Sequence, residues 1–136
     1  MKYVGFIKEN TNIKEAISFE DMIKSKADYD HETLKKIKSY LSNGLLVFSW
    51  MGYTQDPIKK VFIAPDGYST DGEWIWPDYY YYYIDNYSIE VDREFFMHMS
   101  KVGFDLKISD KLLESQGTIE DEMQKKFNKD QNTKGE

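Results

Sequence analysis

The sequence predicts an α+β fold in which an antiparallel β-meander of three to four strands has helices packed on one face. Residues 45–76 show short apolar and aromatic runs separated by turn signals, with no room between them for the crossover helix that parallel strands need. The segments on either side show apolar residues at helical spacing behind capping residues. We therefore expect a single domain over residues 1–127 of this 136-residue chain and a polar C-terminal tail over residues 128–136.

Two helices are predicted ahead of the strands. Ser18 is suited to cap a helix over residues 19–26. Asp30 is suited to cap a second helix over residues 31–42, which Asn43-Gly44 ends. In both cases a short polar side chain precedes an apolar stripe at helical spacing, and such side chains accept hydrogen bonds from the unpaired N–H groups of the first turn.

Four short strands are expected, over residues 45–51, 60–64, 68–70 and 73–76. Asp56-Pro57 separates the first two runs, and Pro65-Asp66-Gly67 is expected to turn the chain before the third. Asp71-Gly72 is a strong signal for a tight hairpin turn, because glycine adopts positive φ angles without steric cost. We expect residues 45–76 to form one antiparallel sheet with Asp71-Gly72 at a hairpin tip.

Further helices are predicted after the strands. Pro77-Asp78 favours a helix start, so the tyrosine-rich segment 79–86 is expected to be helical. Asp92 is suited to cap a helix that carries apolar residues on one face. Ser109 and Thr118 open two shorter predicted helices, and no apolar periodicity follows residue 128.

The charge balance favours a basic or neutral binding partner. The chain has 18 Lys and Arg against 24 Asp and Glu, and residues 45–104 hold nine acidic and four basic residues. Such a segment repels a phosphate backbone, so no nucleic acid is expected as a partner. No cysteine is present, which excludes disulfides and thiolate metal sites. No run of apolar residues is long enough to cross a membrane, so we expect a cytoplasmic protein with no membrane partner.

Histidines and known motifs give no support for catalysis. The sequence has two histidines, and it lacks the GxSxG, GxxxxGK[ST] and GxGxxG patterns. We expect His31 to be exposed and His98 to lie at the edge of a packed helix face with one hydrogen bond. Two histidines far apart in the chain do not form a metal motif, so no metal and no cofactor are expected.

Paired carboxylates offer the one enzymatic interpretation. Asp71 with Glu73, or Asp66 with Asp71, lie near aromatic residues as in a sugar-processing cleft. However, Asp66 and Asp71 both precede glycine, where turn formation accounts for them. We predict that this protein is not an enzyme and that no carboxylate pair lines a deep cleft with a histidine within bonding reach.

Aromatic residues concentrate in residues 45–87, which hold 13 of the 22 in the chain. Five consecutive tyrosines, residues 79–83, wrap more than one turn of a helix, so they cannot all face the core. We expect the following side chains to pack inward: Tyr79, Tyr82 and Tyr83. Tyr80 and Tyr81 are expected to point outward as anchors of an interface.

One segment carries a family resemblance. Residues 70–77, Thr-Asp-Gly-Glu-Trp-Ile-Trp-Pro, are followed by Tyr82-Tyr83 and by the helix segment Glu94-Phe95-Phe96-Met97-His98-Met99. This pattern resembles small bacterial proteins that carry TDGxWxWP, some of which are similar to immunity proteins of polymorphic toxin and contact-dependent inhibition systems. The resemblance covers residues 40–100 and implies a protein that neutralises a cognate toxin by direct binding. It transfers no catalytic residue.

The predicted function is therefore that of a non-catalytic immunity protein that binds a cognate, basic protein toxin. The expected partner-binding residues combine acidic and tyrosine side chains and are Asp71, Glu73, Asp78, Tyr79, Tyr80, Tyr81 and Asp85. The alternative is a small-ligand or carbohydrate-binding domain in which Trp74, Trp76 and the tyrosines stack on the ligand. Strand alternation places both tryptophans on one face, so they can equally be core residues. The sequence leaves the oligomeric state open.

Overall fold

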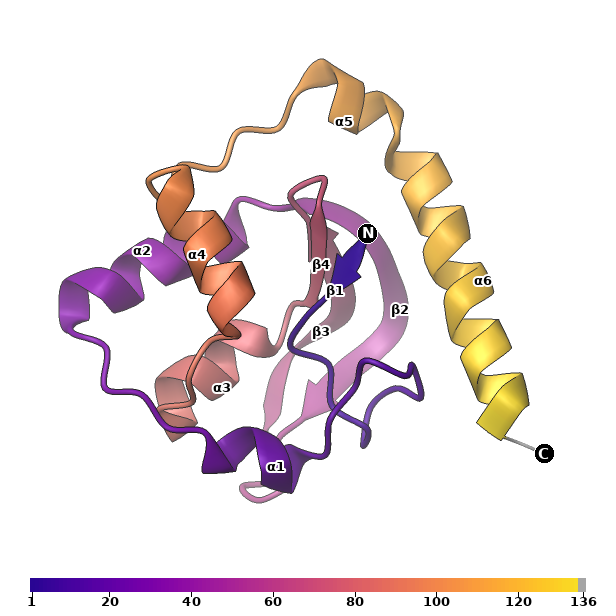
Figure 1. Ribbon diagram of the computed structural model, residues 1–136. Coiled ribbons are helices and arrows are strands. Elements are labelled where there is room, and N and C mark those ends of the chain that lie inside the picture. Colours follow the sequence, from indigo (N-terminus) through magenta and orange to yellow (C-terminus); the bar gives the residue numbers. More distant parts are fainter. Residues whose placement is uncertain (135–136) are drawn as a thin grey trace.

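The computed structural model confirms the α+β fold. It describes the backbone of residues 1–134, and it describes the side chains of these residues except 48–54, 64–66 and 129–134. The aromatic side chains at positions 48, 50 and 53, which contribute to the aromatic segment, therefore lie outside the described part. Over residues 1–134 the chain forms six helices and a four-stranded mixed sheet (Figure 1).

The sheet has the strand order β1-β4-β3-β2. Its strands are β1 (Lys2–Tyr3), β2 (Leu45–Gln55), β3 (Phe62–Thr70) and β4 (Trp74–Pro77). The β2–β3 and β3–β4 pairs are antiparallel, so the predicted antiparallel sheet over residues 45–76 is confirmed. Gly72 has a φ of 103° in the hairpin between β3 and β4, as a tight turn at Asp71-Gly72 requires. Strand β1 is an edge strand of two residues and pairs in parallel with β4. No sequence pattern predicted this strand.

The predicted turn at Pro65-Asp66-Gly67 is wrong, because β3 runs through these residues without interruption. Its ladder with β2 shifts register between the pairs Ser49↔Gly67 and Tyr53↔Pro65. More residues of β2 than of β3 lie between these pairs, so β2 bulges there. A bulge tolerates proline within a strand, because proline has no N–H to contribute to a regular ladder.

Four of the helices begin directly after a capping residue that the sequence predicts. The helices are α1 (Phe19–Lys24), α2 (His31–Ser42), α3 (Tyr80–Tyr87), α4 (Arg93–Lys101), α5 (Asp110–Glu114) and α6 (Gln116–Lys134). The side chains of four residues accept a hydrogen bond from a first-turn N–H, as predicted: Ser18, Asp30, Asp92 and Ser109. Helix α6 begins before Thr118, and its backbone stays helical through Lys134, past residue 128 where the polar tail was expected. No glycine or proline interrupts residues 118–134.

Helices cover both faces of the sheet, so the prediction of helices on one face only is wrong. Figure 1 shows α2, α3 and α4 on one side of the sheet and α6 on the other. Trp74 and Trp76 pack in the core beneath α2 and α4, whereas Ile75 belongs to a second buried cluster that contains Met123 of α6. Successive residues of a strand point to opposite faces, and all of β4 is buried. Both faces of β4 therefore need an apolar cover.

Candidate partner-binding site

One face of α3 and the turn before it brings together three of the predicted partner-binding residues. Asp78, Tyr81 and Asp85 follow one another at spacings of three and four residues, which places them on the same side of the helix. Asp78 and Asp85 are exposed, and Tyr81 is half-buried. We call these three residues the α3 face.

The charges around Tyr81 are close enough to act on its phenol. Burial raises the pKa of the Tyr81 hydroxyl, and the nearby carboxylate of Asp85 raises it further. Lys38 Nζ lies 5.7 Å from the centre of the Tyr81 ring, within the range of a cation–π contact. The Ser69 hydroxyl donates a hydrogen bond of 2.9 Å to Asp78 Oδ1, which orients that carboxylate. The α3 face thus presents a neutral tyrosine between two carboxylates.

A groove of about 390 Å³ adjoins the α3 face. Asp78 and Tyr81 line it together with the exposed Leu46 and the buried Trp76. Gly44 allows this close packing, because a Cβ atom at that position would lie 2.5 Å from the Trp76 ring. The groove offers an apolar surface beside an exposed carboxylate, which suits an apolar or cationic side chain of a partner.

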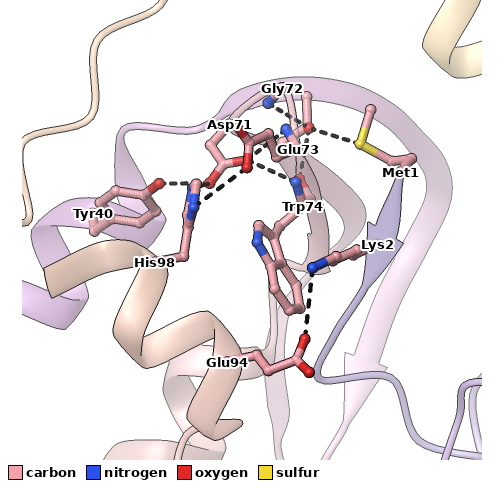
Figure 2. Close-up of polar contacts among 10 residues, drawn as sticks. Met1, Lys2, Tyr40, Asp71, Gly72, Glu73, Trp74, Glu94 and His98 are labelled. Atoms are coloured by element: carbon pink, nitrogen blue, oxygen red, sulfur yellow. Dashed lines mark hydrogen bonds and ion pairs between the residues drawn. The ribbon is translucent and has the colours of Figure 1, made fainter. Parts of the chain in front are cut away.

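Asp71 and Glu73 lie apart from the α3 face, at the β3–β4 hairpin. Only 1% of the Asp71 side chain is exposed, and its Oδ1 accepts hydrogen bonds from the N–H groups of Glu73 (2.9 Å) and Trp74 (2.7 Å). The Tyr40 hydroxyl donates to Asp71 Oδ2 over 2.5 Å, as Figure 2 shows. Glu73, by contrast, has a side chain that is 72% exposed. Of the two predicted residues, only Glu73 is accessible to a partner.

His98 makes one hydrogen bond, to Asp71, as predicted, and it also lies within ion-pair distance of Glu73. Its Nε2 lies 3.0 Å from Asp71 Oδ2, and its Nδ1 lies 3.4 Å from Glu73 Oε2 (Figure 2). Asp71 and Glu73 are therefore a carboxylate pair with a histidine nearby, whereas the prediction concerned such a pair that lines a deep cleft. None of these three residues lines the groove beside the α3 face. Spacing along the chain could not reveal the contact, because it joins the hairpin to α4 across 27 positions.

Tyr40 is the residue of this network that sequence reasoning missed. It lies on α2, and burial raises the pKa of its hydroxyl, an effect that the hydrogen bond to Asp71 reinforces. Three separate elements (α2, the hairpin and α4) meet at the Asp71 carboxylate, which accepts from each neighbouring donor. This arrangement ties elements together and leaves Asp71 little freedom to act on a ligand. Among the residues with described side chains, no group of three or more His, Asp and Glu could hold a metal ion.

Tyr79 and Tyr80 are buried, so the expected outward orientation of Tyr80 is wrong. The Tyr79 hydroxyl accepts a hydrogen bond of 3.0 Å from the N–H of Ile7. The Tyr80 hydroxyl accepts one of 3.2 Å from the N–H of Asp92, and its ring stacks on Phe95. The N-terminal segment covers this part of α3. The inward position of Tyr79 and Tyr83 is confirmed, and Tyr82 is half-buried.

Asp56 is a second buried carboxylate that the sequence indicated only as part of a strand break. Its side chain accepts hydrogen bonds from the hydroxyls of Tyr82 (2.8 Å) and Tyr87 (2.7 Å). It also accepts from the N–H groups of Ile58 (2.8 Å) and Lys59 (3.0 Å). Burial by itself would raise the pKa of the Asp56 carboxyl, but these hydrogen bonds outweigh burial and hold its pKa below the usual value. Asp56 thereby attaches the β2–β3 loop to α3.

Comparison with protein-family models, with curated proteins and with solved structures found no significant match. Among the described residues, no helix combines the length and the apolar character needed to cross a bilayer. Any statement about function therefore rests on the sequence, the surface and the contacts of this chain.

Proposed function

We propose that this protein is a non-catalytic immunity protein that acts in the bacterial cytoplasm by binding a cognate basic toxin and covering its functional surface. The observation that supports this function best is the α3 face, where exposed carboxylates flank Tyr81 beside an apolar groove. The resemblance of residues 70–77 to the TDGxWxWP pattern points in the same direction.

Each part of the α3 face has a physical role in such binding. The carboxylates of Asp78 and Asp85 attract a basic surface and raise the association rate. Tyr81 contributes a large contact area at a low cost in conformational entropy, which slows dissociation. The tight packing of α3 on the core holds these groups in place before binding, so little ordering is required when the partner arrives.

The carbohydrate-binding alternative has less support. Trp74 and Trp76 are buried, and their rings pack against Phe95. They are therefore not available as stacking platforms for a sugar. Tyr81 remains as a half-exposed ring, but a single tyrosine is a weak basis for sugar recognition.

The direct test uses the product of the gene that adjoins the gene of this protein. Purified wild-type protein is titrated with that product, and cells that express the product are scored for survival with and without this protein. We expect tight binding and protection. Absence of both binding and protection would contradict the proposed function.

Variants of the α3 face then locate the interface. We expect Tyr81→Ala to weaken binding by about 2 kcal/mol, the size typical of an interface hot spot. Asp78→Asn/Asp85→Asn should chiefly slow association, and more so at low ionic strength. Glu20→Gln/Asp21→Asn, which removes two exposed charges on α1, is the matched control and should bind as the wild type does. Equal loss in the control would show that net charge, and not the α3 face, governs binding.

A further inference from the structure

The loop between β2 and β3 carries exposed apolar residues next to lysines. Its exposed apolar side chains are Ile58 (59% exposed), Val61 (48%) and Phe62 (74%). Lys59 and Lys60 lie between them, and both are exposed. We call residues 58–62 the basic tip. The loop lies at the bottom of Figure 1.

The basic tip is held in place by the rest of the fold. The Asp56 carboxylate accepts from the N–H groups of Ile58 and Lys59, and the Asp56 N–H donates to the carbonyl of Val61 over 2.9 Å. The Lys60 N–H donates to the Asp56 carbonyl, and Lys60 has a positive φ of 59°. Lys59 Nζ lies 5.3 Å from the centre of the Tyr87 ring. Apolar side chains that are held ordered in water are typical of a binding surface.

A groove whose acidic and apolar lining complements the basic tip lies elsewhere on the same chain. It has a volume of about 480 Å³ and is lined by the N-terminal segment 3–6, by residues 89–94 and by part of α1. Its apolar lining includes Ile17, which is 44% exposed, and the buried side chains of Met22, Ile89 and Tyr80. Four carboxylates also line it, those of Glu15, Glu90, Asp92 and Glu94, together with one arginine, Arg93. We call it the acidic groove.

Two of the groove carboxylates, those of Glu90 and Glu94, are available to a further cation. Glu94 pairs with Lys2 over 3.6 Å, and both side chains are largely exposed. Arg93 Nε lies 3.2 Å from Glu90 Oε1, and the Arg93 side chain is also largely exposed. Ion pairs of this kind are weak and exchange readily with a competing cation.

We propose that the basic tip of one copy docks in the acidic groove of a second copy of this chain. Lys59 and Lys60 then face the carboxylates, and the apolar side chains of the tip enter a groove whose apolar lining matches them. Because the two surfaces differ, the contact is head-to-tail. It yields a closed dimer when both copies engage each other at once, and a growing chain of copies when they do not.

The test is the mass of the protein in solution as its concentration rises, measured by sedimentation velocity. We expect the wild type to self-associate. Lys59→Glu/Lys60→Glu and Ile58→Ser/Phe62→Ser, which alter the basic tip, should raise the dissociation constant about tenfold or more. Glu90→Lys/Glu94→Lys, which alters the acidic groove, should do the same. Circular dichroism confirms that each variant is folded.

A charge swap makes the test specific. A mixture of Lys59→Glu/Lys60→Glu with Glu90→Lys/Glu94→Lys should restore association, because each partner then supplies the charges that the other has lost. Lys35→Glu/Lys36→Glu on α2 and Asp105→Lys/Glu114→Lys reverse exposed charges outside both surfaces. These controls should associate as the wild type does.

Several results would overturn the proposal. They are a monomer at every concentration, association that survives the groove variant, and association that the controls abolish equally. Binding of monomeric wild type to vesicles that contain anionic phospholipid, lost in Lys59→Glu/Lys60→Glu, would instead assign the basic tip to a membrane surface. None of the altered residues belongs to the α3 face, so the result of this self-association test does not depend on whether the protein binds a toxin.

Discussion

The Asp71 carboxylate lies 3.0 Å from Nε2 of His98, and this contact joins the β3–β4 hairpin to α4. The same carboxylate accepts from Tyr40 of α2 and from two backbone N–H groups of its own turn. One buried side chain therefore satisfies donors from three elements. Loss of such a carboxylate leaves several buried donors without a partner, which makes Asp71 a sensitive point for stability.

Replacement of Asp71 tests this role. We expect Asp71→Ala to lower the free energy of unfolding by about 3 kcal/mol, because the Tyr40 hydroxyl and the Trp74 N–H lose their acceptor. Asp85→Ala removes an exposed carboxylate of α3 and should change stability by less than about 0.5 kcal/mol. Urea unfolding followed by circular dichroism measures both. Equal effects would show that Asp71 does not hold the three elements together.

Removing the hydroxyl group from each of two buried tyrosines should change the stability of the protein in opposite directions. Among the residues with described side chains, the Tyr83 hydroxyl finds no hydrogen-bond partner, so Tyr83→Phe should stabilise the protein by about 1 kcal/mol. Tyr40→Phe removes the hydrogen bond to Asp71 and should destabilise the protein by about 1–2 kcal/mol. Thermal unfolding of the two variants gives the comparison. A destabilised Tyr83→Phe would reveal a hydrogen-bonded partner such as a buried water.

Gly5 should not tolerate a side chain. It has a φ of 81°, and a Cβ atom there would lie 2.6 Å from the Tyr80 ring. We expect Gly5→Ala to destabilise the protein by about 2–3 kcal/mol through backbone strain and overpacking. Gly117→Ala in α6 meets no atom within 4 Å and should stabilise by about 0.5 kcal/mol, since alanine favours a helix. Chemical denaturation of both variants distinguishes steric conflict from a general effect of alanine.

Asp56 should contribute to sensitivity toward acid. Its pKa is lower in the folded state than in the unfolded chain, so the folded state favours the carboxylate. The resulting stability is present above the unfolded pKa of about 4 and is lost as the pH falls through the folded pKa. We expect Asp56→Asn to show a smaller loss of unfolding free energy between neutral and acidic pH than the wild type. The pKa of Asp30 is also lowered in the folded state, so some acid dependence of stability should remain in Asp56→Asn. An unchanged pH profile in Asp56→Asn would contradict this role.

The tyrosines should make the fold sensitive to alkali. Burial raises the pKa of four hydroxyls in particular, those of Tyr40, Tyr80, Tyr83 and Tyr87. The folded state then favours the neutral phenol, so its stability is complete below the unfolded pKa of about 10 and falls as the pH rises above it. We expect tyrosinate absorbance to rise steeply together with the loss of circular dichroism. A gradual titration of all tyrosines in a folded protein would show that they are accessible.

Several features of this protein were predictable from local sequence signals. The caps at Ser18, Asp30 and Asp92 and the turn at Asp71-Gly72 depend on hydrogen bonds and φ angles within a few residues. The spacing of Asp78, Tyr81 and Asp85 puts them on one side of α3 and of the turn before it, because helix geometry alone decides which residues share a side. Local chemistry determines such features before any distant part of the chain is in place.

The tertiary structure alone decided which of these surfaces remain exposed. Tyr80 is buried because the N-terminal segment reaches α3, where Ile7 also bonds to Tyr79 across 72 positions. The second face of the sheet is buried because α6 returns to cover Ile75. Strand β1 is too short to be recognised and forms only because β4 offers unpaired backbone groups. Each of these contacts depends on the free energy of burying apolar surface and pairing polar groups between distant segments, which no short window of sequence contains.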